Sequence, residues 1–204
     1  MGGELSGIFA FTKAFGAVLT CWKAPCCKIV YICRKPKDSF VSLWHFTRKL
    51  RPGKQEPMSL EETFELFCKG VCDYGPCWDH LSGYWKGSLE QPEKILFQKY
   101  EEVVKDTPFY VKRLAEFMGY PFSVEEEKEG KIQDIVEFCS FENMRNLEVS
   151  KTGNYPNSLI ENKTLFRKGE IGDWKNYLTP EMAKQLDKIT EQKLEVYGLS
   201  FHSP

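Results

Sequence analysis

The sequence predicts an α/β fold built around parallel strands. Residues 28–33 and 94–98 form two short apolar runs with no polar alternation, which is typical of strands buried on both faces of a parallel sheet. Segments with helical periodicity separate and follow these runs, as in α/β proteins. The 204 residues are 42% hydrophobic and 14% aromatic, a composition that favours one globular domain or two small ones over a disordered chain.

The first half of the chain contains recognisable helix starts. Pro36 suits the first turn of a helix and Asp38 its positive end, so a helix is expected from there to just before Pro52. Ser59 and Glu62 have the spacing of a capping box that opens a second helix, over residues 60–68. A turn at residues 74–76 then leads to a helix over residues 78–85.

The second half is predicted to be mostly helical. Helices are expected over residues 101–105 and 108–118, the latter closed by Gly119, and a single helix with one solvated face over residues 123–139. Residues 146–175 show no clear period and are predicted to be a loop. Thr179 caps a last helix that runs to Leu194. Two strands are too few for a complete sheet of this class.

The charges are unevenly distributed along the chain. The formal net charge is −1, yet the first 50 residues hold eight basic and two acidic side chains. A cationic patch in an otherwise acidic protein favours a small polyanion as the partner and disfavours nucleic acid, whose binders spread basic residues more widely. No apolar run approaches the roughly 20 residues of a membrane-spanning helix, so no membrane partner is expected.

The eight cysteines do not form a recognisable metal or disulfide pattern. Cys68, Cys72 and Cys77, with His80 nearby, depart from zinc-ligand spacing. No secretory signal precedes them. We therefore expect reduced thiols in a cytoplasmic protein and no metal site.

Polar residues follow both predicted strands. Arg34 and Tyr100 occupy the positions just beyond the strands, where ligands bind in open parallel sheets. Ser42 lies about one and a half helical turns into the next helix, so its hydroxyl can face the same crevice. Arg and a nearby hydroxyl suit phosphate oxygens. The alternative is a surface Arg paired with Asp38 and a helix Ser bonded to its own backbone.

A second group of candidate residues lies in the segment 166–175. Arg167 and Lys168 supply adjacent cations, and Gly169 would let the backbone approach a bulky anion closely. Asp173 could orient one of the cations. The same residues are also compatible with an ordinary polar loop.

Three segments together resemble a known family. Residues 33–46, 74–80 and 167–175 follow the same order as motifs of the cytosolic sulfotransferases, and are most similar to the plant, flavonol-sulfotransferase-like branch. The resemblance extends from about Cys27 to Phe201. It implies a P-loop-kinase-like α/β fold and transfer of a sulfuryl group from 3′-phosphoadenosine 5′-phosphosulfate (PAPS) to the hydroxyl of a small acceptor, such as a flavonol, another phenolic or a steroid.

The resemblance also implies roles for individual residues. Arg34 and Ser42 would hold the 3′-phosphate, and Tyr100 would lie beside the nucleotide. The other expected nucleotide contacts are Cys139 and Phe141 at the adenine, and Arg167, Lys168 and Gly169 closing over the 3′-phosphate. On the acceptor side the resemblance implies Trp78, Tyr84 and Trp85, which core packing explains equally well.

The family's catalytic groups have no counterpart in this sequence. The family places a phosphosulfate-binding loop with a Lys, and a catalytic His, well before the position of Arg34, whereas residues 1–26 contain neither. The resemblance therefore implies that the family's N-terminal third is absent, with an atypical segment 1–26 preceding a sulfotransferase domain at 27–204. No catalytic residue is assigned, because His45 follows Arg34 on the helix. The alternative function is a non-catalytic remnant that keeps the 3′-phosphate side of the site.

The resemblance gives a weak signal on oligomeric state. Many animal members dimerise through a short segment whose first positions Lys175 and Thr179 match here. Pro180 and Lys184 stand where that segment needs Val and Glu. A monomer is therefore expected.

Overall fold

The structure is a computed structural model that describes residues 27–50, 58–71, 77–154 and 160–201. The expected N-terminal segment 1–26 and the turn at 74–76 lie outside these ranges. In the described part, β1 (Ile29–Cys33) and β2 (Ile95–Lys99) pair in parallel, with Ile29 opposite Ile95 and Cys33 opposite Lys99. This confirms the parallel strands predicted from the two apolar runs.

Three helices connect the two strands: α2 (Pro36–Leu50), α3 (Leu60–Cys68) and α4 (Cys77–Glu90). Pro36 begins α2 as predicted. The capping box of α3 is complete, because Ser59 N–H donates to Glu62 Oε2 at 2.9 Å and Glu62 N–H donates to Ser59 Oγ at 3.1 Å. Helix α4 is five residues longer than predicted at its C-terminal end.

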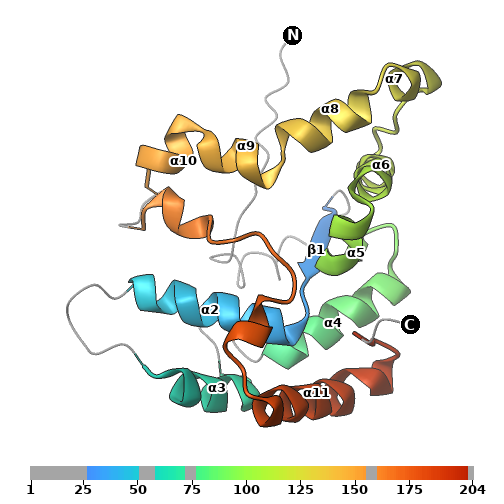
Figure 1. The fold of residues 1–204 in the computed structure, drawn as a ribbon. Helices are drawn as coiled ribbons and strands as arrows, with labels where there is room; N and C mark the ends of the chain where they lie inside the picture. Colours follow the sequence, from blue (N-terminus) through green and yellow to red (C-terminus); the bar gives the residue numbers. More distant parts are fainter. Residues whose placement is uncertain (1–26, 51–57, 72–76, 155–159, 202–204) are drawn as a thin grey trace.

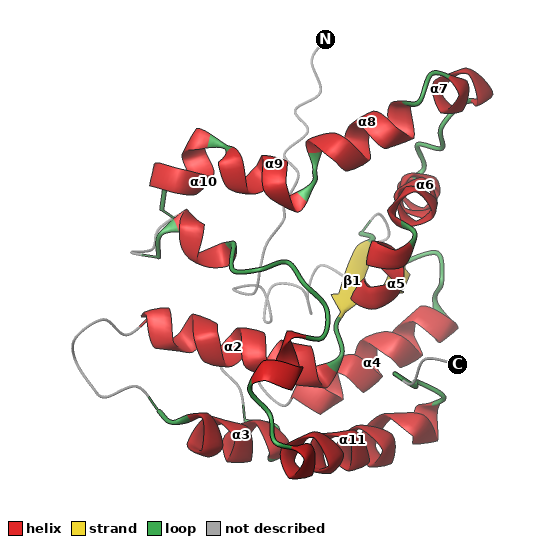
Figure 2. Ribbon diagram, viewed as in Figure 1, coloured by secondary structure: helices red, strands yellow, loops and turns green. Residues whose placement is uncertain are grey.

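Helices also make up most of the chain after β2 (Figure 2). The α-helices are α5 (Tyr100–Lys105), α6 (Thr107–Met118), α7 (Val124–Lys128), α8 (Lys131–Phe138), α9 (Phe141–Asn146), α10 (Glu148–Thr152) and α11 (Pro180–Leu194). Three 3-10 turns, η1 (Asn162–Leu165), η2 (Asp173–Asn176) and η3 (Glu195–Tyr197), complete the described elements. None of the helices in these ranges is both long and apolar enough to cross a membrane.

The elements form two parts (Figure 1). Helices α2, α3, α4 and α11 pack together on one side of the molecule, and α6 to α10 form an arc on the other. The core lies in the first part, where Phe40 and Leu186 are fully buried and Phe40 packs edge-on against Phe64 from α3. The segment between η1 and η2 runs from the arc back to α2.

Three sequence-based expectations are wrong in detail. The single helix over residues 123–139 is broken into α7 and α8 at Gly130, whose φ of +78° is left-handed. The predicted loop 146–175 contains α10, η1 and η2, which are too short to produce an apolar period. Strand β1 is not buried on both faces: Tyr31 stacks on Tyr84 of α4, but Val30 and Ile32 on the opposite face are 39% and 54% exposed.

Candidate functional site: an anion-binding loop over the strand ends

The residues just beyond the two strands lie side by side. Because Cys33 and Lys99 are paired in register, Arg34 and Tyr100 leave the sheet at the same edge. The Arg34 guanidinium carbon lies 4.9 Å from the centroid of the Tyr100 ring. A guanidinium stacked in this way is held in a fixed orientation while its N–H groups stay available as donors.

The segment between η1 and η2 crosses over this pair. Arg34 Nη2 donates a hydrogen bond to the backbone carbonyl of Glu170, 136 residues away. The Tyr100 hydroxyl lies 3.5 Å from the Gly169 carbonyl, to which it donates. Residues from β1, β2 and the 166–173 segment therefore meet at the carboxyl edge of the sheet.

Asp38 anchors this segment to the first turn of α2. Asp38 is 2% exposed, and its carboxylate accepts the backbone N–H of Gly172 at 2.9 Å and that of Trp174 at 3.3 Å. The sequence pattern suggested that Asp38 stabilises the helix dipole or pairs with Arg34, and it gave no sign of this contact with the distant backbone. An acidic residue in a first helical turn is too common to indicate a partner so far along the chain.

Asp173 joins the two cations of the segment. It accepts hydrogen bonds from Arg167 Nη1 at 2.5 Å, from Lys168 Nζ at 2.6 Å and from Asn176 Nδ2 at 2.9 Å. Burial would raise the pKa of Asp173, but the bonds from Lys168, Arg167 and Asn176 outweigh it and hold the pKa well below the ordinary 3.8. The prediction that Asp173 orients a cation is confirmed.

Gly169 and Phe141 make a close backbone–ring contact. Gly169 has a φ of +71°, and a Cβ placed there would lie 2.8 Å from Cδ2 of the Phe141 ring. The Phe141 ring in turn packs edge-on against Phe166, with centroids 5.8 Å apart. The aromatic residue predicted at the adenine and the glycine predicted at the phosphate are thus in contact.

Within the described residues, the other predicted site residues form no hydrogen bond or ring contact with the group formed by Arg34, Tyr100 and the 166–173 segment. Ser42 is half-buried on α2, and Cys139 is exposed at the junction of α8 and α9, two residues before Phe141. Of the aromatic residues expected on the acceptor side, Trp78 is buried in the core, Tyr84 stacks on Tyr31, and Trp85 Nε1 donates to the Tyr197 carbonyl at 2.7 Å. Their observed contacts are those of packing residues.

Several buried polar atoms at the strand ends lack partners within the described residues. They are Arg34 Nε, Gln98 Nε2 and Glu101 Oε2. Buried donors and acceptors are nearly always satisfied, so each of these atoms is free to bond to a ligand or a water. The unpartnered Nε of Arg34 is a donor suited to an anionic oxygen.

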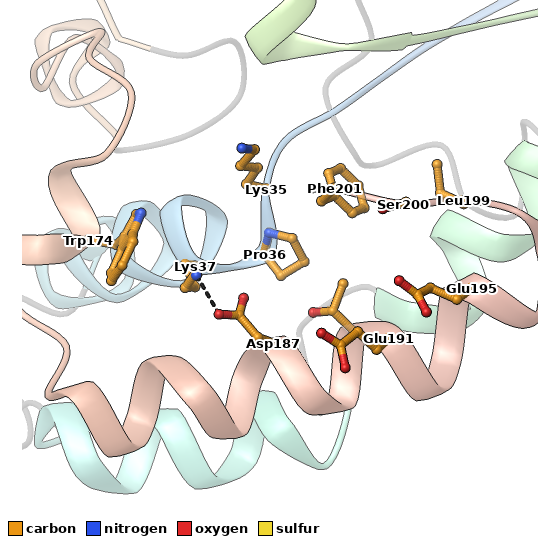
Figure 3. Close-up of a pocket in the computed structure, with 11 residues that line it drawn as sticks. Lys35, Pro36, Lys37, Trp174, Asp187, Glu191, Glu195, Leu199, Ser200 and Phe201 are labelled. Atoms are coloured by element: carbon orange, nitrogen blue, oxygen red, sulfur yellow. Dashed lines mark hydrogen bonds and ion pairs between the residues drawn. The ribbon is translucent and has the colours of Figure 1, made fainter. Parts of the chain in front are cut away.

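A small cavity lies beside the first turn of α2 (Figure 3). It has a volume of about 170 Å³ and lies between the start of α2, α11 and the chain around Phe201. At its edge Lys37 Nζ pairs with Asp187 at 2.7 Å and lies 4.2 Å from the centroid of the Trp174 ring. These contacts tie α11 to the residue that follows Asp173.

The described residues contain no group of His, Cys, Asp and Glu side chains that could hold a metal ion. The described cysteines are thiols, and Cys33 and Cys68 are raised in pKa to about 12 and about 11, in each case chiefly by burial. Both therefore stay protonated at neutral pH. Cys72, part of the spacing considered for zinc, lies outside the described ranges.

Arg34 lies just beyond β1 of an α/β fold, beneath an anchored loop that carries two cations, at the edge of the sheet where ligands bind in open parallel sheets. Residues 18–198 match the sulfotransferase domain, and the chain belongs to the sulfotransferase family.

Plant cytosolic sulfotransferases are among its relatives. Flavonol 4′-sulfotransferase of Flaveria chlorifolia is 55% identical over 174 residues, which cover 85% of this chain and 54% of that protein. Cytosolic sulfotransferase 5 of Arabidopsis thaliana is 50% identical over 179 residues, or 88% of this chain and 55% of that protein. The chain spans about half the length of the curated relatives it matches.

Solved structures confirm the predicted fold class. Mouse sulfotransferase SULT7A1 complexed with PAP superimposes with a TM-score of 0.66 and 31% identity, over 83% of this chain and 59% of that chain. A putative steroid sulphotransferase of Arabidopsis thaliana gives a TM-score of 0.59 and 38% identity, over 86% of this chain and 48% of that chain.

Proposed function

We propose that the chain binds the 3′-phosphoadenosine part of PAPS, or of the product 3′-phosphoadenosine 5′-phosphate (PAP), at the carboxyl ends of β1 and β2. The observation that carries this proposal is the position of Arg34, which stacks on Tyr100, bonds to the Glu170 carbonyl and keeps a buried Nε without an acceptor. A phosphate oxygen would satisfy that donor.

The same geometry supports distinct roles around the nucleotide. Arg34 and Ser42 bind the 3′-phosphate from the strand and α2, and Tyr100 lies beside the nucleotide. Arg167, Lys168 and Gly169 close over the phosphate, whose charge of about −1.5 to −2 is matched by two guanidinium groups and an ammonium. The Phe141 ring stacks on the adenine, with Cys139 at its edge. Asp173 keeps Arg167 and Lys168 together before the nucleotide arrives.

The reaction of the family is sulfuryl transfer to a small acceptor, and the part of it proposed for this chain is binding of the nucleotide. The acceptor oxygen bonds to sulfur, the bond from sulfur to the 5′-phosphate oxygen breaks, the acceptor proton passes to a base, and PAP leaves. The flavonol and steroid names of its relatives support a flavonol, another phenolic or a steroid as the acceptor. The cytosolic names of other relatives support a cytoplasmic location, and we propose a monomer.

A specific observation favours nucleotide binding without transfer by this chain alone. The family's base and phosphosulfate loop have no counterpart in the sequence, and His45 on α2 packs edge-on against Tyr177, with ring centroids 4.8 Å apart. A positioned base contributes about 10²–10⁴-fold, and one oxyanion donor about 10²–10³-fold. Both losses together leave almost no turnover.

Binding is tested by the rise in melting temperature with PAP and with 5′-AMP, which lacks the 3′-phosphate. PAP is expected to stabilise the chain and 5′-AMP to have little effect. Arg34→Lys keeps the charge but loses the guanidinium, and is expected to weaken PAP binding at least tenfold. Arg113→Lys, at an exposed position on α6, is the matched control. Equal stabilisation by both nucleotides would contradict the proposal.

Transfer is tested separately, by incubating the chain with radiolabelled PAPS and a flavonol. We expect no sulfated product above background. Product formed at the rates of the full-length relatives would show that this chain holds the catalytic groups and would exclude the non-catalytic alternative.

A further inference from the structure

A wide basic groove lies between the second half of α2 and the segment from α9 to η1. Its volume is about 790 Å³. Five of its lining side chains are basic: Arg48 and Lys49 from α2, Arg145 from α9, Lys151 from α10 and Lys163 from η1. The acidic side chains lining it are Glu142 and Glu161. The groove therefore has a clear excess of positive charge.

Much of that charge is not neutralised within the described residues. Lys163 pairs with Glu161 at 2.8 Å, and Arg48 lies 4.8 Å from the centroid of the Trp44 ring. Lys49, Arg145 and Lys151 are exposed and form no ion pair with any other described residue. Three unpaired cations around one open groove produce a local positive potential that extends over about a Debye length.

The groove is bounded by the segments that carry the candidate nucleotide site. Lys49 follows Ser42 by seven residues on α2, which places both on one helix face. Arg145 follows Phe141 by four residues on α9, again on one face. Phe166 lines the groove, precedes Arg167 and packs against Phe141. The groove therefore adjoins the segments of the proposed nucleotide site, and it meets them at Phe166.

We propose that this basic groove is the route by which the nucleotide approaches its site, and that its cations raise the association rate. The proposal rests on the proposed function. PAP carries two phosphates, each with about −1.5 to −2 charge, so a cationic groove attracts it strongly before contact. Exposed cations on long side chains hold a bound ligand weakly, so their effect falls on association and not on dissociation.

The experiment measures PAP association and dissociation rates by stopped flow in the double variant Arg145→Glu/Lys151→Glu. The association rate is expected to fall about tenfold at low salt, within the range of electrostatic steering, and the difference from wild type to shrink as salt is added. The dissociation rate is expected to stay within about twofold. If circular dichroism shows that the charge-reversed variant is unfolded, Lys49→Gln/Arg145→Gln is used in its place. Its association rate is expected to fall less, with the same dependence on salt.

Lys184→Glu/Lys188→Glu is the matched control, because both residues are exposed on α11 and change the total charge equally. Helix α11 lies on the side of α2 away from α9 and α10 (Figure 1). A control that slows association equally would show that only net charge matters and would overturn the proposal. So would an unchanged association rate, or an effect confined to dissociation. Failure of wild type to bind PAP at all would overturn the proposed function as well.

Discussion

The Asp38 carboxylate binds the backbone N–H of Gly172 at 2.9 Å, although the two residues are 134 positions apart. The same carboxylate also accepts from Trp174. One buried side chain on α2 thus fixes the position of the segment 166–174, which carries Arg167 and Lys168, relative to Arg34 and Tyr100. Because Asp38 contacts the backbone of the segment, this contact does not depend on which side chains Gly172 and Trp174 carry.

Replacing Asp38 is therefore expected to affect both stability and binding. Asp38→Asn leaves one carbonyl oxygen to serve two buried N–H donors and removes the charge. Losing a buried charge-assisted hydrogen bond costs about 1–3 kcal/mol, measured as the free energy of unfolding in urea, and PAP binding should weaken. Asp134→Asn on α8, at an exposed position, is the control. Unchanged PAP affinity in Asp38→Asn would show that the segment is held by other contacts.

The hydrogen bonds of Asp173 with Arg167 and Lys168 predict that the free energy of unfolding depends on pH. Because the folded pKa of Asp173 is lowered, its contribution is fully present above the unfolded pKa near 3.8 and is lost as the pH falls through the folded value. Asp173→Asn should therefore cost about 1–3 kcal/mol at pH 7. The difference in free energy of unfolding between wild type and Asp173→Asn should become smaller below about pH 4. Urea unfolding of both proteins at several pH values measures this difference. A difference that stays the same below pH 4 would contradict the prediction.

Alanine substitutions at two glycines distinguish the cost of a left-handed backbone from the cost of a clash between the new Cβ and a neighbouring side chain. Gly169 and Gly198 have φ values of +71° and +74°, but a Cβ at Gly169 meets the Phe141 ring, whereas one at Gly198 meets nothing within 4 Å. Gly198→Ala should cost only the strain of a left-handed residue, about 1–2 kcal/mol. Gly169→Ala should cost more and should also weaken PAP binding. Calorimetric titration and thermal melting of both variants test this, and equal effects would contradict it.

His45 predicts a second effect of pH. Its pKa is lowered, first by burial and next by the positive charge of Arg167. A lowered folded pKa means that stability is present above the unfolded value of about 6.5 and is lost as the pH falls through the folded value. Wild type should therefore lose stability between pH 7 and pH 5 relative to His45→Gln. Parallel stability profiles for the two proteins over that range would contradict this prediction.

The elements that were predicted well are those that local residues define. Pro36, Ser59 and Thr179 begin helices for reasons contained in their own neighbourhoods, and the structure has helices starting there. The break of the predicted helix 123–139 at Gly130 was not predicted, because a sequence does not show the sign of φ. The exposure of Val30 and Ile32 depends on what covers one face of β1, which no local pattern records.

The candidate site could be predicted only in part for the same reason. Arg34 and Tyr100 were found because strand ends are general ligand positions, and the 167–169 cluster because of its charge. The Asp38 anchor and the contact of Phe141 with Gly169 join residues from different parts of the chain. Such pairs depend on how the elements pack, so composition and spacing did not reveal them.

The contact between Asp38 and Gly172 also affects when the site forms. Arg34 with Glu170 and Lys37 with Asp187 span similar lengths of chain, 136 and 150 residues. Closing loops of that length is slow, and contacts of high sequence separation form late. During synthesis on the ribosome, the contacts of Arg34 and Asp38 with the segment therefore form only after Glu170 and Gly172 have emerged, and a nascent chain stalled before Glu170 would have neither contact.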